Sequence, residues 1–186
     1  MLSLCEAGSA AQPIQSATDQ NSAQIVTFLF KIFDLKNAFI QTSLQEAANE
    51  PEIREVTQQA LTSFDIADLA SRLSQPVSQV LAPQEIKQCV AFIESKNGTA
   101  VLRASQEAAS PNELPKYLDL LPQQEKHAAM EFFNSNCFKK TIEFMSSKEA
   151  KDIAKGYGSE IMCKYAKRTN TDMLNTLRRH GACQDT

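Results

Sequence analysis

The chain has 186 residues, enough for one domain with its own core, and a net charge of −3 at pH 7, which excludes no class of partner. Hydrophobic residues make up 42 % and charged residues 22 %, as in ordinary globular proteins. Only five glycines and seven prolines are present, which argues against the many tight turns of an all-β fold.

The charges are distributed unevenly along the chain. Residues 1–80 are rich in acids, whereas residues 139–186 carry an excess of bases. Those bases are Lys139, Lys140, Lys148, Lys151, Lys155, Lys164, Lys167, Arg168, Arg178 and Arg179. We favour solvated helix faces as the explanation and keep a patch for an acidic partner as the alternative. Nucleic acid is not expected as a partner, because no aromatic residues interleave these bases.

The first residues are typical of the end of a signal peptide. Gly8-Ser9-Ala10 and Ser9-Ala10-Ala11 both fit the small-residue rule for cleavage. We therefore interpret residues 1–19 as a signal-peptide remnant with a flexible segment, and residues 20–186 as a single domain. The prediction is export to the periplasm or secretion; the alternative is a disordered cytosolic tail.

Apolar residues become dense from Ala23 to Ile40 and satisfy helical spacing on more than one face. The pattern predicts a long central helix, bent near residues 34–36. Core packing is the favoured explanation, and an apolar surface for a partner or lipid is the alternative. A second helix is predicted to begin at residues 49–52, where Asn49 can cap and Pro51 is tolerated, and to end near Thr62.

The rest of the chain also shows the apolar spacing and end signals of helices. Further helices are predicted over residues 65–80, 83–96 with a helical continuation over 99–109, 111 onward, 122–133, 138–145, 148–167 and 171–180. We expect Pro76 to break or kink its helix and Asn97-Gly98 to end another. The sequence has no run of 18 apolar residues, so no transmembrane helix is predicted. The predicted fold is therefore all-α, a compact bundle of about seven to nine helices.

One motif occurs twice, forty residues apart, over residues 81–98 and 121–138. The matching pairs are Leu81 and Leu121, Glu85 and Glu125, Phe92 and Phe132, and Ser95 and Ser135. Leu precedes each helix as a staple, Glu lies in the first turn where the helix dipole favours an acid, and Phe follows on the same side two turns later. Ser falls where each helix ends. The repeat predicts two related helical hairpins.

This pattern, Leu-x-x-x-Glu then Phe-x-x-Ser with a following Gly98, resembles the signature of a bacterial exported all-helical family known as domain of unknown function 2059. Phe33-Asp34-Leu35 is similar to the start of such domains, and the resemblance covers residues 20–168. The second copy departs from the signature, because Phe138 stands in place of the Gly. The resemblance implies an all-α fold and a periplasmic location, and it carries no catalytic residues.

Four cysteines follow the expected cleavage site, which lies after Cys5. They are Cys89, Cys137, Cys163 and Cys183. In an oxidising compartment they allow up to two disulfides in three possible pairings. Cys89 lies in an apolar stripe and is interpreted as a buried small hydrophobe. Cys163 and Cys183 flank the last helix and are the preferred pair.

Residues for catalysis or metal binding are scarce. His180 and Cys183 are three residues apart, but no paired Cys-x-x-Cys accompanies them as a zinc site would need. Ten residues separate His127 from Cys137, too far along one helix for a thiol dyad. Carboxylate pairs at helix starts are explained by capping. We expect no enzyme, metal or cofactor, but an exported protein that acts by binding a protein partner. The alternatives are an immunity protein that inhibits a secreted toxin, and a carrier of an apolar ligand.

Overall fold

The computed structural model describes residues 17–169, 171–179, 181 and 183. Within these residues all regular structure is helical, with eleven α helices, two short 3-10 helices and no strand. The elements are α1 (Ala17–Ile32), α2 (Leu35–Glu46), α3 (Pro51–Ala60), η1 (Leu61–Ser63), α4 (Ile66–Val80), α5 (Pro83–Ile93), α6 (Lys96–Glu107), η2 (Pro111–Glu113), α7 (Leu114–Asp119), α8 (Gln123–Asn134), α9 (Asn136–Ser146), α10 (Lys148–Thr169) and α11 (Thr171–Arg179). The all-α prediction is confirmed.

The predicted number of seven to nine helices is wrong, partly because the long first helix is divided. Asp34 adopts the left-handed conformation, with φ 48° and ψ 40°, and separates α1 from α2. The side chain of Asn37 donates a hydrogen bond to Asp34 Oδ2 at 2.7 Å. Asp tolerates this region better than most residues, which explains why the chain turns here without a glycine. The helix also begins at Ala17, within the stretch expected to be flexible.

Other helix boundaries differ from the prediction at specific residues. Asn97 and Gly98 do not end a helix but lie in the first turn of α6. Pro76 lies inside α4, which continues to Val80 without a break. Glu50, and not Asn49, occupies the N-cap position of α3. Asn and Gly suit a first turn as well as a helix end, so packing decides their place, whereas Pro76 stays in α4 against its own preference.

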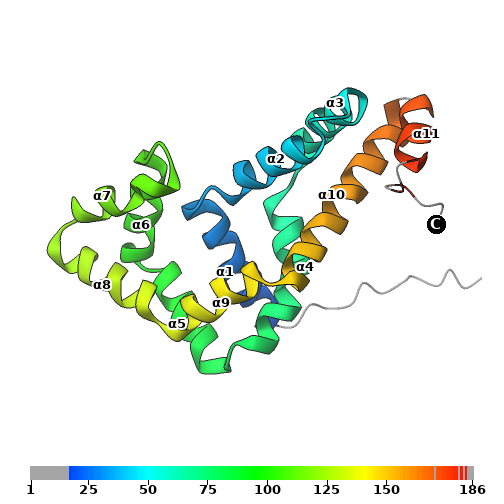
Figure 1. Ribbon diagram of the computed structural model, residues 1–186. Coiled ribbons are helices and arrows are strands. Elements are labelled where there is room, and N and C mark those ends of the chain that lie inside the picture. Colours follow the sequence, from blue (N-terminus) through cyan, green and yellow to red (C-terminus); the bar gives the residue numbers. More distant parts are fainter. Residues whose placement is uncertain (1–16, 170, 180, 182, 184–186) are drawn as a thin grey trace, which may run out of the picture.

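Helix α1 is the centre of the main core and packs against α4, α5 and α6. Its side chains Ile25, Val26 and Leu29 are completely buried. In Figure 1, α1 lies in the middle of the molecule, with α6, α7 and α8 at one end and α3 and α11 at the other. Core packing therefore explains the dense apolar residues of this helix.

A second, smaller core lies where α3, α10 and α11 meet. Val56, Ala166, Leu174 and Leu177 are buried there together with Cys183. It forms the end of the molecule at which α10 and α11 lie in Figure 1. Among the described residues, no helix has both the length and the apolar character needed to cross a membrane.

Candidate functional site

The anchor residues of the repeat meet in the main core. The rings of Phe92 and Phe132 are stacked, with centroids 4.2 Å apart and planes at 8°. The ring of Phe28 of α1 meets both rings edge-on, with its centroid 6.4 Å from that of Phe92 and 5.8 Å from that of Phe132. Leu81 is buried and Leu121 is half-buried. The two copies are therefore joined to each other and to α1 through the phenylalanine that they share.

The two first-turn glutamates have different surroundings. Glu85 accepts a hydrogen bond from the backbone N–H of Ala82 at 2.8 Å and pairs with Lys140 Nζ at 2.8 Å and 2.9 Å. The ammonium of Lys140, and then the N–H of Ala82, hold the pKa of Glu85 below its ordinary value. In the second copy, Glu125 Oε2 is buried and has no hydrogen-bond partner.

The two serines cap the helices that follow, which gives a specific role to the residues expected at the helix ends. Ser95 Oγ accepts hydrogen bonds from the N–H groups of Asn97 and Gly98, at 3.1 Å and 3.2 Å. Ser135 Oγ accepts one from Phe138 N–H at 3.2 Å. Each motif copy is thus a helix, a capping serine and a second helix.

Gly98 and Phe138 occupy the same position in the two copies but make different contacts. A Cβ at Gly98 would lie 2.4 Å from the carbonyl oxygen of Phe92 and 2.6 Å from that of Ile93. Only glycine allows the start of α6 to approach the end of α5 so closely. The ring of Phe138 contacts those of Phe33, Phe132 and Phe133. The first copy therefore has a tight junction, and the second an aromatic cluster.

The four described cysteines lie in two pairs at disulfide distance. Cys89 of α5 faces Cys137 of α9, with Cα atoms 6.3 Å apart. Cys163 of α10 faces Cys183, with Cα atoms 5.6 Å apart, in the pairing preferred from the sequence. Cys89 is buried as expected, but the sequence interpretation missed its partner. The first pair links the two copies, and the second holds the chain after α11 to the small core.

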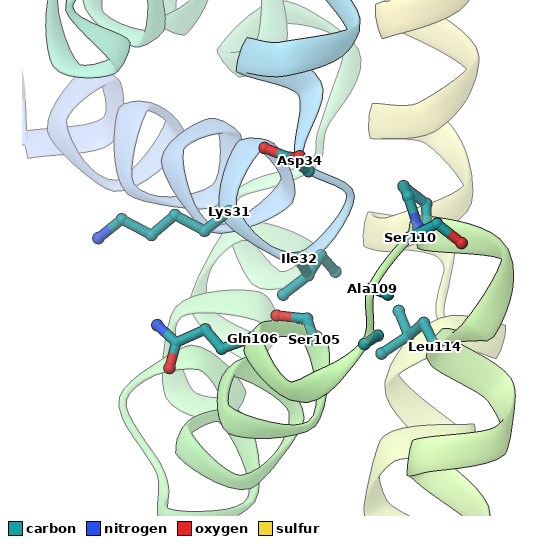
Figure 2. A pocket seen from close by; sticks show the side chains of 10 residues that line it. Lys31, Ile32, Asp34, Ser105, Gln106, Ala109, Ser110 and Leu114 are labelled. Atoms are coloured by element: carbon teal, nitrogen blue, oxygen red, sulfur yellow. The ribbon is translucent and has the colours of Figure 1, made fainter.

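Two adjacent depressions form a groove between α1 and α6. One of about 220 Å³ lies where the end of α1 meets the turn between α6 and α7, and the other, of about 200 Å³, lies further along the same two helices. Figure 2 shows the first, whose lining residues are Lys31, Ile32, Asp34, Ser105, Gln106, Ala108, Ala109, Ser110, Pro111 and Leu114. The second is lined by Gln24, Thr27, Phe28, Lys31, Ile93, Gly98, Thr99 and Leu102. Lys31 lines both, so we treat them as one α1–α6 groove.

The α1–α6 groove was not predicted from the sequence. A usable signal was present, because Gln24, Thr27 and Lys31 interrupt an otherwise apolar helix at spacings of three and four residues. That spacing places them on one face of α1. On α6, Thr99 and Gln106 provide a second polar edge. Residues of this kind on an otherwise buried helix indicate a face that meets solvent.

The strongest electrostatic cluster lies elsewhere, between α4 and α10. Arg72 Nη1 pairs with Glu160 Oε2 at 2.7 Å and lies over the ring of Tyr157. Hydrogen bonds from Arg72 and then from Lys164 lower the pKa of Glu160 to about 2. The hydroxyl of Tyr157 both donates to the carbonyl of Asp65 and accepts from its N–H at 3.1 Å. These contacts bind α10 to the start of α4, which is a structural role.

The remaining sequence candidates lie apart from one another. His127 is exposed on α8 beside Glu131, at 3.3 Å, and His180 lies outside the described residues. Where the chain is described, no cluster of three histidine, cysteine or carboxylate side chains could hold a metal ion. Several of the C-terminal bases form ion pairs: Lys140 with Glu85, Lys148 with Asp152, and Lys164 with Glu160.

Comparison with models of known protein families, with curated proteins and with solved structures found no match for this chain. Membership of the family known as domain of unknown function 2059 stays a prediction that rests on the repeated motif.

Proposed function

We propose that this chain is an exported, non-catalytic protein that acts by binding another protein in the α1–α6 groove. The observation that carries the proposal is the groove itself, with an apolar floor at Phe28 and Leu102 and polar edges on both helices. Protein-binding surfaces commonly combine an apolar centre with a polar rim. We also interpret the two motif copies as related helical hairpins that support this groove.

The two cysteine pairs support export to the periplasm or secretion. Disulfides persist in oxidising compartments and are rare in the cytosol. The pair formed by Cys89 and Cys137 links α5 to α9, and α5 also packs against both α1 and α6. A disulfide at this place would hold the frame of the groove in one arrangement, which lowers the entropic cost of binding.

The packing of the aromatic residues favours a protein partner over an enclosed apolar ligand. The aromatic residues that suggested a carrier pack on each other, as Phe28 does on Phe92 and Phe132. Protein binding is therefore the function we propose.

The proposal is tested by photo-crosslinking in the native host. A photoreactive amino acid replaces Thr99, which is exposed at the groove, or Gln58, which is exposed on α3. We expect one defined partner to crosslink in an envelope or secreted fraction from the Thr99 position only. If the partner is a toxic hydrolase that binds this chain in a one-to-one complex, the result would favour an immunity protein. Equal crosslinking from both positions, or from neither, would contradict the proposal.

A further inference from the structure

Lys31 is the cation at the point where the two depressions of the α1–α6 groove meet. It lies in the last turn of α1, is exposed, and lines both depressions. Among the described residues no ion pair involves Lys31. Figure 2 shows Lys31 and Gln106 reaching from the two walls of the groove toward the same side. A carboxylate placed here would receive a cation from one wall and an amide donor from the other.

Two acidic residues, Asp34 in the lining of the groove and Glu94 next to the lining residue Ile93, already accept hydrogen bonds. Asp34 accepts the side-chain amide of Asn37 at 2.7 Å. Glu94 accepts the side-chain amide of Gln24 at 3.2 Å. Neither of these carboxylates pairs with Lys31. Because no described carboxylate pairs with Lys31, an acidic group supplied by the partner is its complement in charge.

The apolar floor lies one helical turn from Lys31. Phe28 precedes Lys31 by three residues on α1, and Leu102 precedes Gln106 by four residues on α6. At 1.5 Å per residue, these steps correspond to about 4.5 Å on α1 and about 6 Å on α6. An extended chain covers about 6.6 Å in two residues and places both side chains on the same face.

We propose that the α1–α6 groove binds an extended segment of a protein in which a large apolar residue and an Asp or Glu stand two positions apart. The apolar side chain lies on Leu102 and on the edge of Phe28, which is 5 % exposed, and the carboxylate pairs with Lys31 and accepts from Gln106. The inference rests on the proposed function and names the chemistry of its partner.

The test uses the purified full chain with its disulfides formed and a displayed library of random heptapeptides. We expect selected peptides to share an acidic residue two positions from Leu, Ile, Phe or Met. The best peptide is then measured by fluorescence anisotropy against the natural chain, Lys31→Glu, and the control Lys151→Glu. Lys151 is exposed on α10 and does not line the groove.

Lys31→Glu is expected to weaken binding roughly three- to tenfold, as for an exposed ion pair turned into a repulsion, and Lys151→Glu to leave it unchanged. A peptide with Lys in place of its acidic residue should recover affinity for Lys31→Glu. Thermal unfolding of each variant checks that it is folded; Lys31 is exposed, so its replacement leaves the core intact.

The inference is overturned if no peptide is selected, if selected peptides lack the acidic residue, or if Lys31→Glu binds them as tightly as the natural chain. These outcomes are separate from the crosslinking result. A partner captured from the Thr99 position without dependence on Lys31 would keep the proposed function and remove the carboxylate requirement. Absence of a partner at Thr99 would remove the function itself.

Discussion

The two copies of the repeat share the residues that build a helix and differ in those that join it to the next. In both, Phe is the core anchor, and the two rings stack on each other. In both, Ser caps the second helix, Ser95 through two N–H groups and Ser135 through one. The shared residues therefore account for local structure, as the pattern predicts.

The differences lie at the position of Gly98 and Phe138. Gly98 lets α6 approach the end of α5 closely, and it lines the α1–α6 groove beside Thr99. Phe138 instead fills the space beside Phe132 with an aromatic ring. A groove therefore remains next to the first copy, whereas in the second copy an aromatic ring stands at the position of Gly98.

The largest expected effect comes from removing the link between the copies. The pair Cys89–Cys137 has a sequence separation of 48, and a disulfide closing such a loop stabilises by about 4 kcal/mol in the chain-entropy description. Cys89→Ser with Cys137→Ser should lower the free energy of unfolding by about 2–4 kcal/mol. Urea unfolding measured by circular dichroism checks this value.

The second cysteine pair provides the control for that experiment. Cys163→Ser with Cys183→Ser removes a link with a sequence separation of 20, at the small core away from both copies. We expect faster proteolysis of the C-terminal segment, with the groove region still protected. If both double variants loosened the same region, the copies would not be the part that the first disulfide holds together.

The next largest effect is expected at Gly98, where a substitution tests whether the first copy needs glycine. Gly98→Ala would place a Cβ 2.4 Å from the carbonyl oxygen of Phe92, so backbone must move, and we expect a loss of about 1–3 kcal/mol in the free energy of unfolding. Gly156→Ala is the matched control, because nothing lies within 4 Å of its Cβ inside α10. It should stabilise by about 0.5–1 kcal/mol. Equal effects in chemical unfolding would show that Gly98 is not needed for the close approach.

Sequence patterns were sufficient for the helical fold and for the partners of local contacts. Apolar spacing identified α1 as central, and the position of Asp34 as a bend was correct. Ser147 caps α10, the helix predicted over residues 148–167, by accepting from the N–H of Ala150. These features depend on residues within four positions of one another, where propensity and hydrogen bonding act directly.

The features that the patterns missed depend on residues far apart in the chain. Asn97-Gly98 suits a helix end as well as a first turn, and the contact with α5 decides between them. Cys89 has the apolar neighbours of a buried thiol, and only the packing of α9 on α5 shows that Cys137 faces it. The groove likewise needs the pairing of α1 with α6, which no local spacing encodes.

A smaller effect compares the two capping serines. Ser95→Ala and Ser135→Ala each remove an N-cap acceptor, a change that costs about 1 kcal/mol. Ser95 accepts from two N–H groups and Ser135 from one, so the loss should be larger for Ser95→Ala. Thermal unfolding of the two single variants measures the difference. The reverse order would mean that the second junction depends on its cap more than the first.

The smallest effect concerns the two first-turn glutamates and pH. The pKa of Glu85 is lowered in the folded state by Lys140 and by the N–H of Ala82. A carboxyl with a depressed folded pKa contributes stability above its unfolded pKa, about 4.3, and loses it as pH falls through the folded pKa. The melting temperature of Glu85→Gln should therefore lie below that of the natural chain at pH 7, and the difference should shrink toward pH 3.

Glu125→Gln tests whether that pH dependence belongs to the residue type or to its surroundings. Glu125 lies at the same position of the second copy, but its Oε2 is buried without a hydrogen-bond partner. An unpaired buried carboxylate oxygen is unfavourable, so the amide should not lower the melting temperature at pH 7. A fall equal to that of Glu85→Gln would mean that position in the first turn decides the effect. A fall in Glu85→Gln alone would assign it to the surroundings of Glu85, namely Lys140 of α9 and the N–H of Ala82.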